Sequence, residues 1–170
     1  IKQTIIDTRR DLHKHPELSF KEYRTSKLVA SKLEKFGIQV DRNIGKTGVV
    51  GTLKGKTKGH TIAFRADMDA LPIQETGNVP YKSINDGVMH ACGHDAHTSM
   101  LLGAAEILSK RKNKIKGNIK FIFQPAEEGY GGAKFMIDDG ALKDVNEIYY
   151  GLCSRGSGGL CYLDCYYKNC

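Results

Sequence analysis

Long apolar stretches are missing from this sequence. No run approaches the ~20 residues that a membrane-spanning helix needs, and the first residues, 1–4, form no signal-peptide core before charged residues resume. We therefore expect a cytoplasmic protein with no membrane association. The chain begins with Ile1 and has no initiator methionine, which indicates a fragment or a trimmed chain.

Cysteine is nearly absent from most of the chain. Cys92 is the only cysteine in the first 150 residues, so no disulfide framework holds this part together. The last twenty residues, in contrast, hold Cys153, Cys161, Cys165 and Cys170. A single redox environment does not explain both the scarcity of cysteine before residue 150 and its abundance after it, so the tail needs an explanation of its own. A structural zinc site made by the tail cysteines remains an alternative, although their spacing is loose.

Aromatic residues do not alternate with the basic ones, although the chain is basic overall. Lys and Arg number 26 against 19 Asp and Glu, a formal net charge of +7. The lysines are scattered or lie in turns such as 54–58, so a solvated surface explains them better than a nucleic-acid site. A nucleic-acid-binding domain is kept as an alternative. The length of 170 residues suits one domain, which buries roughly 70% of its unfolded-chain surface.

Helical and strand patterns alternate along the chain. Ser19 and Glu22 form a Ser-x-x-Glu capping box that predicts the start of the second helix, and Gly37 fits its C′ position. Alternation of this kind predicts an α/β fold, a sheet flanked by helices with crossovers long enough for parallel pairing. The predicted helices lie at about 5–14, 19–36, 95–110 and 131–139, and the strands at about 38–42, 47–53, 61–66, 118–124 and 146–151.

Acidic residues follow two of the predicted strands. Asp67 and Asp69 end the strand at 61–66, and Glu127 and Glu128 come just after the strand at 118–124. In α/β sheets, ligands bind beyond the carboxyl ends of the strands, so these acids are candidates for one site. Arg65 either neutralises the nearby acids, binds a substrate carboxylate or forms an ordinary salt bridge.

The densest chemical signal is the segment 89–97. It holds a thiol, three imidazoles and a carboxylate (Cys92, His90, His94, His97 and Asp95) at a predicted loop-to-helix junction. These are the side chains that bind zinc, manganese and related divalent ions. A buried cysteine beside surface histidines is the alternative.

The acid pairs can support the same chemistry. Of Glu127 and Glu128, one can bind a metal ion while the other takes a proton from water. Of Asp67 and Asp69, one can orient a ligand imidazole while the other faces the site. The alternatives are a solvated surface for the glutamates and a turn-forming pair for the aspartates.

Four segments in this order, 10–19, 65–72, 89–98 and 123–129, resemble the successive signatures of the M20 metallopeptidase family. The sequence is most similar to the amidohydrolase branch. That branch includes N-acyl-amino-acid amidohydrolases, hippurate hydrolases, auxin-conjugate hydrolases and N-acetyldiaminopimelate deacetylases.

The resemblance implies a zinc-peptidase-like α/β catalytic domain with a smaller inserted domain. It also implies two divalent metal ions, which can be zinc, manganese, cobalt or nickel. By position, Cys92, His94 and Glu128 match metal ligands, Glu127 matches the general base and Asp69 matches the active-site aspartate.

The resemblance gives the other motif residues lesser roles. His13 and His15 lie in the N-terminal signature, where we expect a structural role. Supporting roles in the site are expected for Asp67, His90, Asp95, His97 and Arg65.

The implied reaction is hydrolysis of the amide that links an acyl group to an amino acid. Glu127 would take a proton from water and return it to the leaving amine. The implied partner is a small N-acyl amino acid, with no nucleic acid or membrane, and longer relatives are expected to form homodimers through the inserted domain. The resemblance does not name the acyl group, the amino acid or the metal.

The family pattern stops near residue 152. Relatives continue with a histidine where this chain has Cys153, and no histidine follows His97. We interpret 1–152 as the N-terminal part of the catalytic domain, truncated before the inserted dimerisation domain, and 153–170 as an unrelated or out-of-frame tail.

This truncation predicts an incomplete enzyme. We expect at most one well-liganded metal site, weak or no activity, and an apolar sheet face left open. The alternatives are a non-catalytic metal-binding fragment and a metallo-exopeptidase that acts on small peptides.

Overall fold

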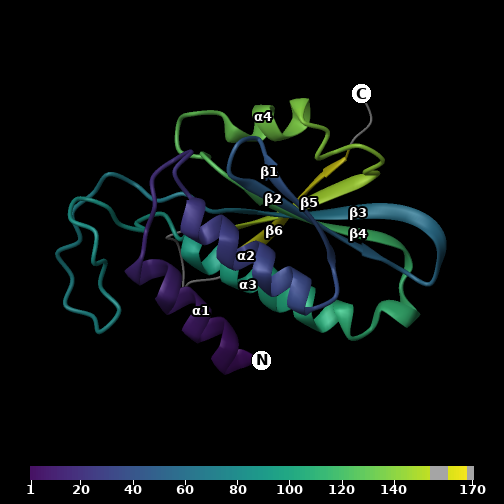
Figure 1. The fold of residues 1–170 in the computed structure, drawn as a ribbon, viewed down its shortest axis with the longest axis horizontal. Helices are drawn as coiled ribbons and strands as arrows, with labels where there is room; N and C mark the ends of the chain where they lie inside the picture. The colour runs from purple at the N-terminus through teal and green to yellow at the C-terminus, as the bar shows by residue number, and fades with distance from the viewer. Residues whose placement is uncertain (154–160, 168–170) are drawn as a thin grey trace.

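A computed structural model describes residues 1–153 and 161–167, with side chains as far as residue 151. Helices and strands alternate over the first part of the chain, and two strands end it (Figure 1). The elements are α1 (Lys2–Lys14), α2 (Tyr23–Lys35), β1 (Gln39–Ile44), β2 (Gly48–Lys54), β3 (Thr57–Asp67), α3 (His94–Ser109), a short 3-10 helix (Lys112–Lys114), β4 (Lys116–Gln124), α4 (Gly132–Asp138), β5 (Glu147–Cys153) and β6 (Cys161–Tyr167).

The strands form one mixed sheet in the order β1-β2-β4-β3-β5-β6. β3 is parallel to both β4 and β5, whereas the β1–β2, β2–β4 and β5–β6 pairs are antiparallel. The predicted α/β fold is therefore confirmed, and parallel pairing is confined to the three strands in the middle of the order. These are the strands joined through helices, because a parallel pair needs a crossover connection.

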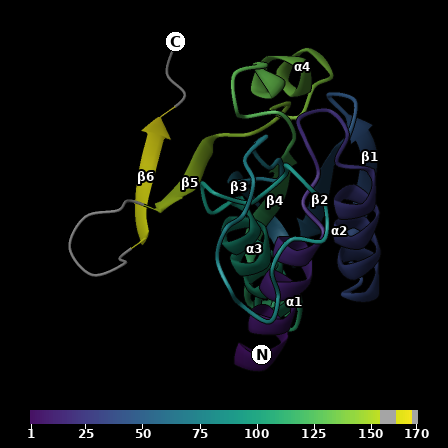
Figure 2. The same cartoon turned by 90° about the vertical axis from the view of Figure 1, so that its left-hand side faces the viewer.

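Helices cover both faces of the sheet (Figure 2). α2 and α3 pack on one face with α1 against α3, and α4 packs on the other (Figure 1). The alternation of side chains along β4 explains both contacts. Phe121 and Phe123 join the core beneath α2 and α3, while Ile122 joins Val50 and Met136 beneath α4.

The second helix begins later than the capping box predicts. α2 starts at Tyr23, and neither Ser19 nor Glu22 caps it, because the side chains of both have partners elsewhere in the protein. The first amides of α2 are instead satisfied by Glu17, whose carboxylate accepts from the backbone N–H of Arg24 at 2.9 Å and of Thr25 at 2.8 Å. A more distant carboxylate therefore replaces the local cap.

The crossover from β3 through α3 to β4 places two strand ends side by side. Asp67 is the register partner of Gln124, so the residues after β3 and β4 leave the sheet at the same edge. α3 starts at this edge after Gly93, which has a φ of 115° that suits glycine. The topology therefore brings the acids after the strands and the histidines of α3 together.

The end of the chain adds a strand that the sequence pattern does not predict. β6 pairs antiparallel with β5, with Cys161 in register with Cys153. The side chains of the tail cysteines lie outside those described, so the tail zinc site and the boundary at residue 152 stay predictions. Within the described part of the chain, no helix combines the length and apolar character that crossing a membrane requires.

Candidate metal centre

The side chain of His94 lies at the centre of the candidate site. Its Nδ1 lies 2.8 Å from the carbonyl oxygen of Asp69 and 3.3 Å from Oδ1 of the same residue. A carbonyl oxygen only accepts, so Nδ1 carries a hydrogen and the lone pair of the neutral ring is on Nε2. This Nε2 faces three carboxylates, at 3.6 Å from Asp67 Oδ2, 3.8 Å from Glu127 Oε2 and 3.8 Å from Glu128 Oε1.

These separations suit donors that share an ion. Two ligands at about 2.1 Å from one tetrahedral ion lie about 3.4 Å apart, farther than in a hydrogen bond. Cys92 Sγ, a nitrogen of His94 and a carboxylate oxygen of Glu128 all lie within 4.8 Å of one another. A thiol, an imidazole and a carboxylate are the donors that zinc and related ions take. The residues present therefore fit a divalent ion.

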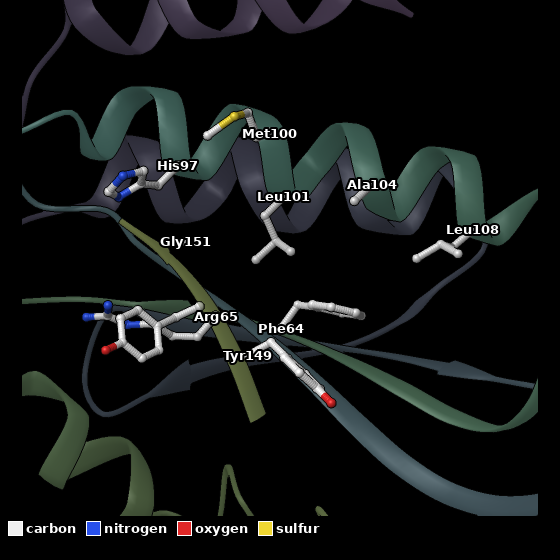
Figure 3. Close-up of a pocket in the computed structure, with 10 residues that line it drawn as sticks. Phe64, Arg65, His97, Met100, Leu101, Ala104, Leu108, Tyr149 and Gly151 are labelled. Carbon is white, nitrogen blue, oxygen red and sulfur yellow. The ribbon is translucent and has the colours of Figure 1, made fainter. Parts of the chain in front are cut away.

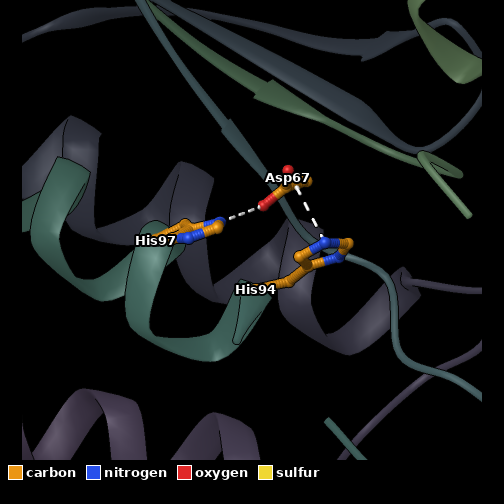
Figure 4. Close-up of side chains that lie close together, drawn as sticks. All are labelled: Asp67, His94 and His97. Atoms are coloured by element: carbon orange, nitrogen blue, oxygen red, sulfur yellow. Dashed lines mark hydrogen bonds and ion pairs between the residues drawn. The ribbon is translucent and has the colours of Figure 1, made fainter. Parts of the chain in front are cut away.

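Asp67 forms a second possible group with the same histidine (Figure 4). However, its Oδ1 accepts a hydrogen bond from His97 Nδ1 at 2.6 Å, and its Oδ2 lies 3.0 Å from an Arg65 guanidinium nitrogen. Burial opposes ionisation of Asp67, but the His97 hydrogen bond and the charges of His94 and Arg65 outweigh it and lower its pKa. The two groups share His94, and the expected number of ions stays a prediction.

The carboxylate of Asp69 connects several parts of the site. Its side chain is fully buried, and its carboxylate accepts from Ser19 Oγ at 2.7 Å and from the backbone N–H groups of Glu127 at 3.1 Å and Glu128 at 3.0 Å. Burial opposes its ionisation, but His94 and these donors prevail and lower the pKa of Asp69 to about 2. Asp69 therefore orients both the imidazole and the loop that carries the two glutamates.

The metal-free site holds protons that an ion must displace. Burial disfavours charged His94, but the carboxylates of Asp69 and Asp67 outweigh it and raise its pKa to about 9. Burial and the neighbouring Glu128 carboxylate raise the pKa of Cys92 to about 11. Burial also raises the pKa of Glu127, and its side chain remains 41% exposed, so water reaches it. Binding of an ion by these donors would therefore release protons.

His13 and Asp95 belong to a separate buried network. His13 Nδ1 lies 2.7 Å from Asp95 Oδ2, and its Nε2 lies 3.2 Å from Glu75 Oε1. Arg9 adds an ion pair to Asp95 at 2.8 Å. The hydrogen bond to Asp95, opposed by burial and assisted by Glu75, raises the pKa of His13. These contacts join α1 and the segment before α3 to the start of α3.

Two other histidines differ from each other in their partners. His15, which follows the last residue of α1, donates from Nδ1 to the backbone oxygen of Asp11 at 2.8 Å. His90 is 5% exposed, and neither of its ring nitrogens has a hydrogen-bond partner among the described residues. Burial lowers the pKa of His90 to about 4, so its ring is neutral at pH 7.

A cavity of about 250 Å³ opens beside the site, between α3 and strands β3 and β5 (Figure 3). Most of its lining is apolar, with Phe64 and Leu101 among its walls. His97 and Arg65, the partners of Asp67, lie at one end, and Leu108 lies at the other (Figure 3). The apolar sheet face that was expected to be left open stays a prediction, because this cavity has α3 as one of its walls.

Sequence reasoning missed the roles of two residues, Ser19 and Glu75. Ser19 reaches Asp69, and Glu75 reaches His13, from segments whose local patterns predict a cap and an irregular loop. No local signal identifies such contacts, because the partners lie 50 and 62 positions away along the chain.

A donor set of this kind at the carboxyl edge of an α/β sheet is typical of metal-binding enzymes. Residues 63–160, more than half of the chain, match the profile of Peptidase family M20/M25/M40. The chain belongs to this family, and the resemblance inferred from its motifs is confirmed.

Individual relatives share this part of the chain. Thermostable carboxypeptidase 2 of Saccharolobus solfataricus is 55% identical over 152 residues, 88% of this chain and 39% of the relative. Hippurate hydrolase of Campylobacter jejuni is 53% identical over 141 residues, 83% of this chain and 36% of the relative. The chain thus spans about two fifths of the length of the curated relatives it matches.

The fold is shared with a solved structure of the same family. The YXEP protein of Bacillus subtilis, described as a dinuclear metal-binding peptidase from the M20 family, superposes with a TM-score of 0.84. The two sequences are 48% identical, and the match covers 87% of this chain and 42% of the other. The zinc-peptidase-like architecture expected from the motifs is therefore confirmed.

Proposed function

We propose that this chain contributes the metal and base residues of a hydrolase that cleaves the amide bond of N-acyl amino acids. The observation that carries the proposal is the clustering of Cys92, His94 and Glu128 within 4.8 Å of one another, with Oε2 of Glu127 3.8 Å from Nε2 of His94. The name of the hippurate hydrolase relative supports this substrate class, because hippurate is an acylated amino acid.

In this proposal Cys92, His94 and Glu128 hold a divalent ion, such as zinc, manganese, cobalt or nickel. Such an ion, when bound, acts as a Lewis acid that acidifies water and polarises a carbonyl group. The name of the YXEP protein supports a second ion in longer relatives. The Asp69 carbonyl fixes the tautomer of His94, so the nitrogen with the lone pair is the one that faces the ion.

Glu127 is the proposed general base. It is the most exposed carboxylate around His94 Nε2, and its raised pKa makes it a stronger base than an ordinary glutamate. Its carboxylate takes a proton from the attacking water as the new C–O bond forms. It then gives that proton to the amide nitrogen as the C–N bond breaks, which yields a carboxylic acid and an amino acid.

The aspartates and their partners position these groups. Asp69 holds the amides of Glu127 and Glu128, so we assign it a positioning role in the active site rather than contact with the substrate. Asp67, buried against His97 and Arg65, places a fixed negative charge 3.6 Å from His94 Nε2. That charge favours a cation at the same place.

The role of Glu127 is tested by Glu127→Gln, in this chain and in a full-length relative. The amide keeps the size of the side chain but accepts no proton, so we expect bound metal to stay at the wild-type level while hydrolysis of hippurate by the relative is abolished. The control Glu34→Gln changes an exposed glutamate that is paired with Arg42, and should alter neither. Unchanged hydrolysis in Glu127→Gln would refute the base assignment.

A second candidate function is removal of the C-terminal residue of small peptides. The observation that favours it is the name of the 55% identical relative, a carboxypeptidase. Both reactions break an amide next to an amino acid, so the same base and ion serve either. Comparing acetylated amino acids with dipeptides that have a free amino terminus, in a full-length relative, separates the two.

A further inference from the structure

Glu22 is a buried carboxylate in a part of the fold where the sequence pattern predicts a helix cap. Its side chain is 0% exposed, and none of the ion pairs among the described residues includes it. Burial raises its pKa, partly offset by the hydroxyl of Thr47 and by backbone donors. A buried acid without a cation is costly, so its position needs an explanation beyond the start of α2.

The partners of Glu22 come from three separate loops. Oε1 accepts from the backbone N–H of Phe20 at 3.0 Å and from that of Ala126 at 2.9 Å. Oε2 accepts from the hydroxyl of Thr47. One side chain therefore connects the loop before α2, the turn between β1 and β2, and the loop after β4.

Each of these loops has a non-glycine residue in the left-handed region at the point of contact. Phe20 has a φ of 59° and Ala126 a φ of 49°, and Lys46, which precedes Thr47, has a φ of 77°. Side chains disfavour this region, so such conformations persist where surrounding contacts impose them. Phe20 and Ala126 each donate a backbone hydrogen bond to Glu22 from such a conformation, and Lys46 directly precedes the third donor, Thr47.

The loop after β4 carries the chemistry of the candidate site. Three consecutive backbone N–H groups in it point at buried carboxylates: that of Ala126 at Glu22, and those of Glu127 and Glu128 at Asp69. Asp69, which follows β3, accepts from the second and third of these amides. Glu22 accepts from the first. With both anchors the side chains of Glu127 and Glu128 are directed at His94 Nε2.

We propose that Glu22 is a positioning residue that, together with Asp69, fixes the loop bearing Glu127 and Glu128. The consequence for metal and base chemistry rests on the proposed function, whereas the anchoring itself does not. All three donors to Glu22 are neutral, so an amide oxygen at this position serves Phe20 and Ala126 equally well. The amide nitrogen of Glu22→Gln can then donate to the Thr47 hydroxyl.

Hydrogen exchange of the loop amides in the metal-free chain tests the anchoring. In Glu22→Ala we expect the amides of 126–128 to exchange at least about tenfold faster, while those of β4 change little. Glu22→Gln should restore exchange to the wild-type rate. The control Val29→Ala removes core volume from α2, the helix that follows Glu22, and should not single out 126–128.

Calorimetric measurement of Mn²⁺ binding tests whether the anchoring by Glu22 affects the metal site. Mn²⁺ is the probe because the thiols of the tail prefer softer ions. We expect Glu22→Ala to weaken affinity by about tenfold or more and Glu22→Gln to restore it. Should Glu22→Ala fail to fold, Glu22→Asp, one methylene too short to reach all three donors, takes its place. Unchanged exchange at 126–128, or an equal rise throughout the protein, would overturn the proposal.

The two proposals fail in different ways. If Glu128→Ala leaves Mn²⁺ affinity unchanged, the metal site of the proposed function is wrong. The exchange result for Glu22→Ala would still decide whether Glu22 anchors the loop.

Discussion

Replacing Asp69 with asparagine measures how strongly one buried carboxylate organises the site. The substitution keeps the shape of the side chain but turns one accepting oxygen into a donating NH₂ group. Since Oδ1 accepts from Glu127 N–H and Oδ2 from Ser19 and Glu128, either orientation of the amide places a donor against a donor. The variant therefore loses hydrogen bonds as well as the charge that faces His94.

The pKa of Asp69 gives the size of the effect. Folding lowers this pKa from 3.8 to about 2, and at about 1.4 kcal/mol per tenfold change in equilibrium this favours the ionised carboxylate by about 2 kcal/mol. Solvent screens little of this interaction, because the side chain of Asp69 is 0% exposed. Part of this free energy is the attraction between Asp69 and His94. The same attraction raises the pKa of His94, so it is not added a second time.

Urea unfolding of the metal-free chain with a chelator provides the assay. We expect Asp69→Asn to lower the free energy of unfolding by about 2 kcal/mol at pH 7. A carboxyl group with a lowered pKa stabilises the fold above its unfolded value of 3.8, and this stabilisation is lost as the pH falls through the folded value of about 2. The difference between the variant and the wild type should therefore shrink to about half near pH 3.

An exposed aspartate serves as the control. Asp86→Asn should change stability by less than about 0.5 kcal/mol, as surface substitutions usually do. A cost for Asp69→Asn that is the same at pH 7 and pH 3, or no cost at pH 7, would refute the reasoning.

Two further predictions concern metal affinity and the core. Affinity for Mn²⁺ should rise between about pH 6 and pH 8, by about tenfold per unit for each proton displaced, because His94 and Cys92 have pKa values of about 9 and about 11 without metal. Calorimetry in buffers of different ionisation enthalpy counts these protons, and a pH-independent affinity would contradict the coupling. Phe121→Ala should cost about 3–5 kcal/mol in urea unfolding because Phe121 is fully buried, against about 1 kcal/mol or less for Phe135→Ala, at a side chain that is 40% exposed. Equal costs would show that Phe121 is not part of a packed core.

Local patterns predicted the fold well where the physical cause is local. The apolar run 119–123 becomes the buried strand β4, and Gly37 follows the end of α2 with a φ of 72°, as its predicted C′ position requires. The start of α2 was wrong, because Ser19 and Glu22 make long-range contacts that outweigh a capping box. The third strand was predicted too short, since β3 extends through the exposed residues 57–60 beside β4.

The location of the site was predictable for a topological reason. Parallel β3 and β4 end at one edge, so acids that follow them must meet there, and the histidines of α3 start at the same edge. The division of labour was not predictable from spacing. Asp67 and Asp69 are two residues apart, yet one carboxylate faces Arg65 and the other holds backbone amides. Only the packed structure shows which donors surround each acid.

Binding of one divalent ion by Cys92, His94 and Glu128 is tested most directly by Co²⁺ titration followed by absorption spectroscopy. A thiolate ligand gives a sulfur-to-cobalt charge-transfer band in the near ultraviolet. We expect the band to saturate at one ion per chain, to disappear in Cys92→Ser, and to persist when the four tail cysteines are replaced with serine. A band that survives in Cys92→Ser and disappears with the tail cysteines would contradict the site.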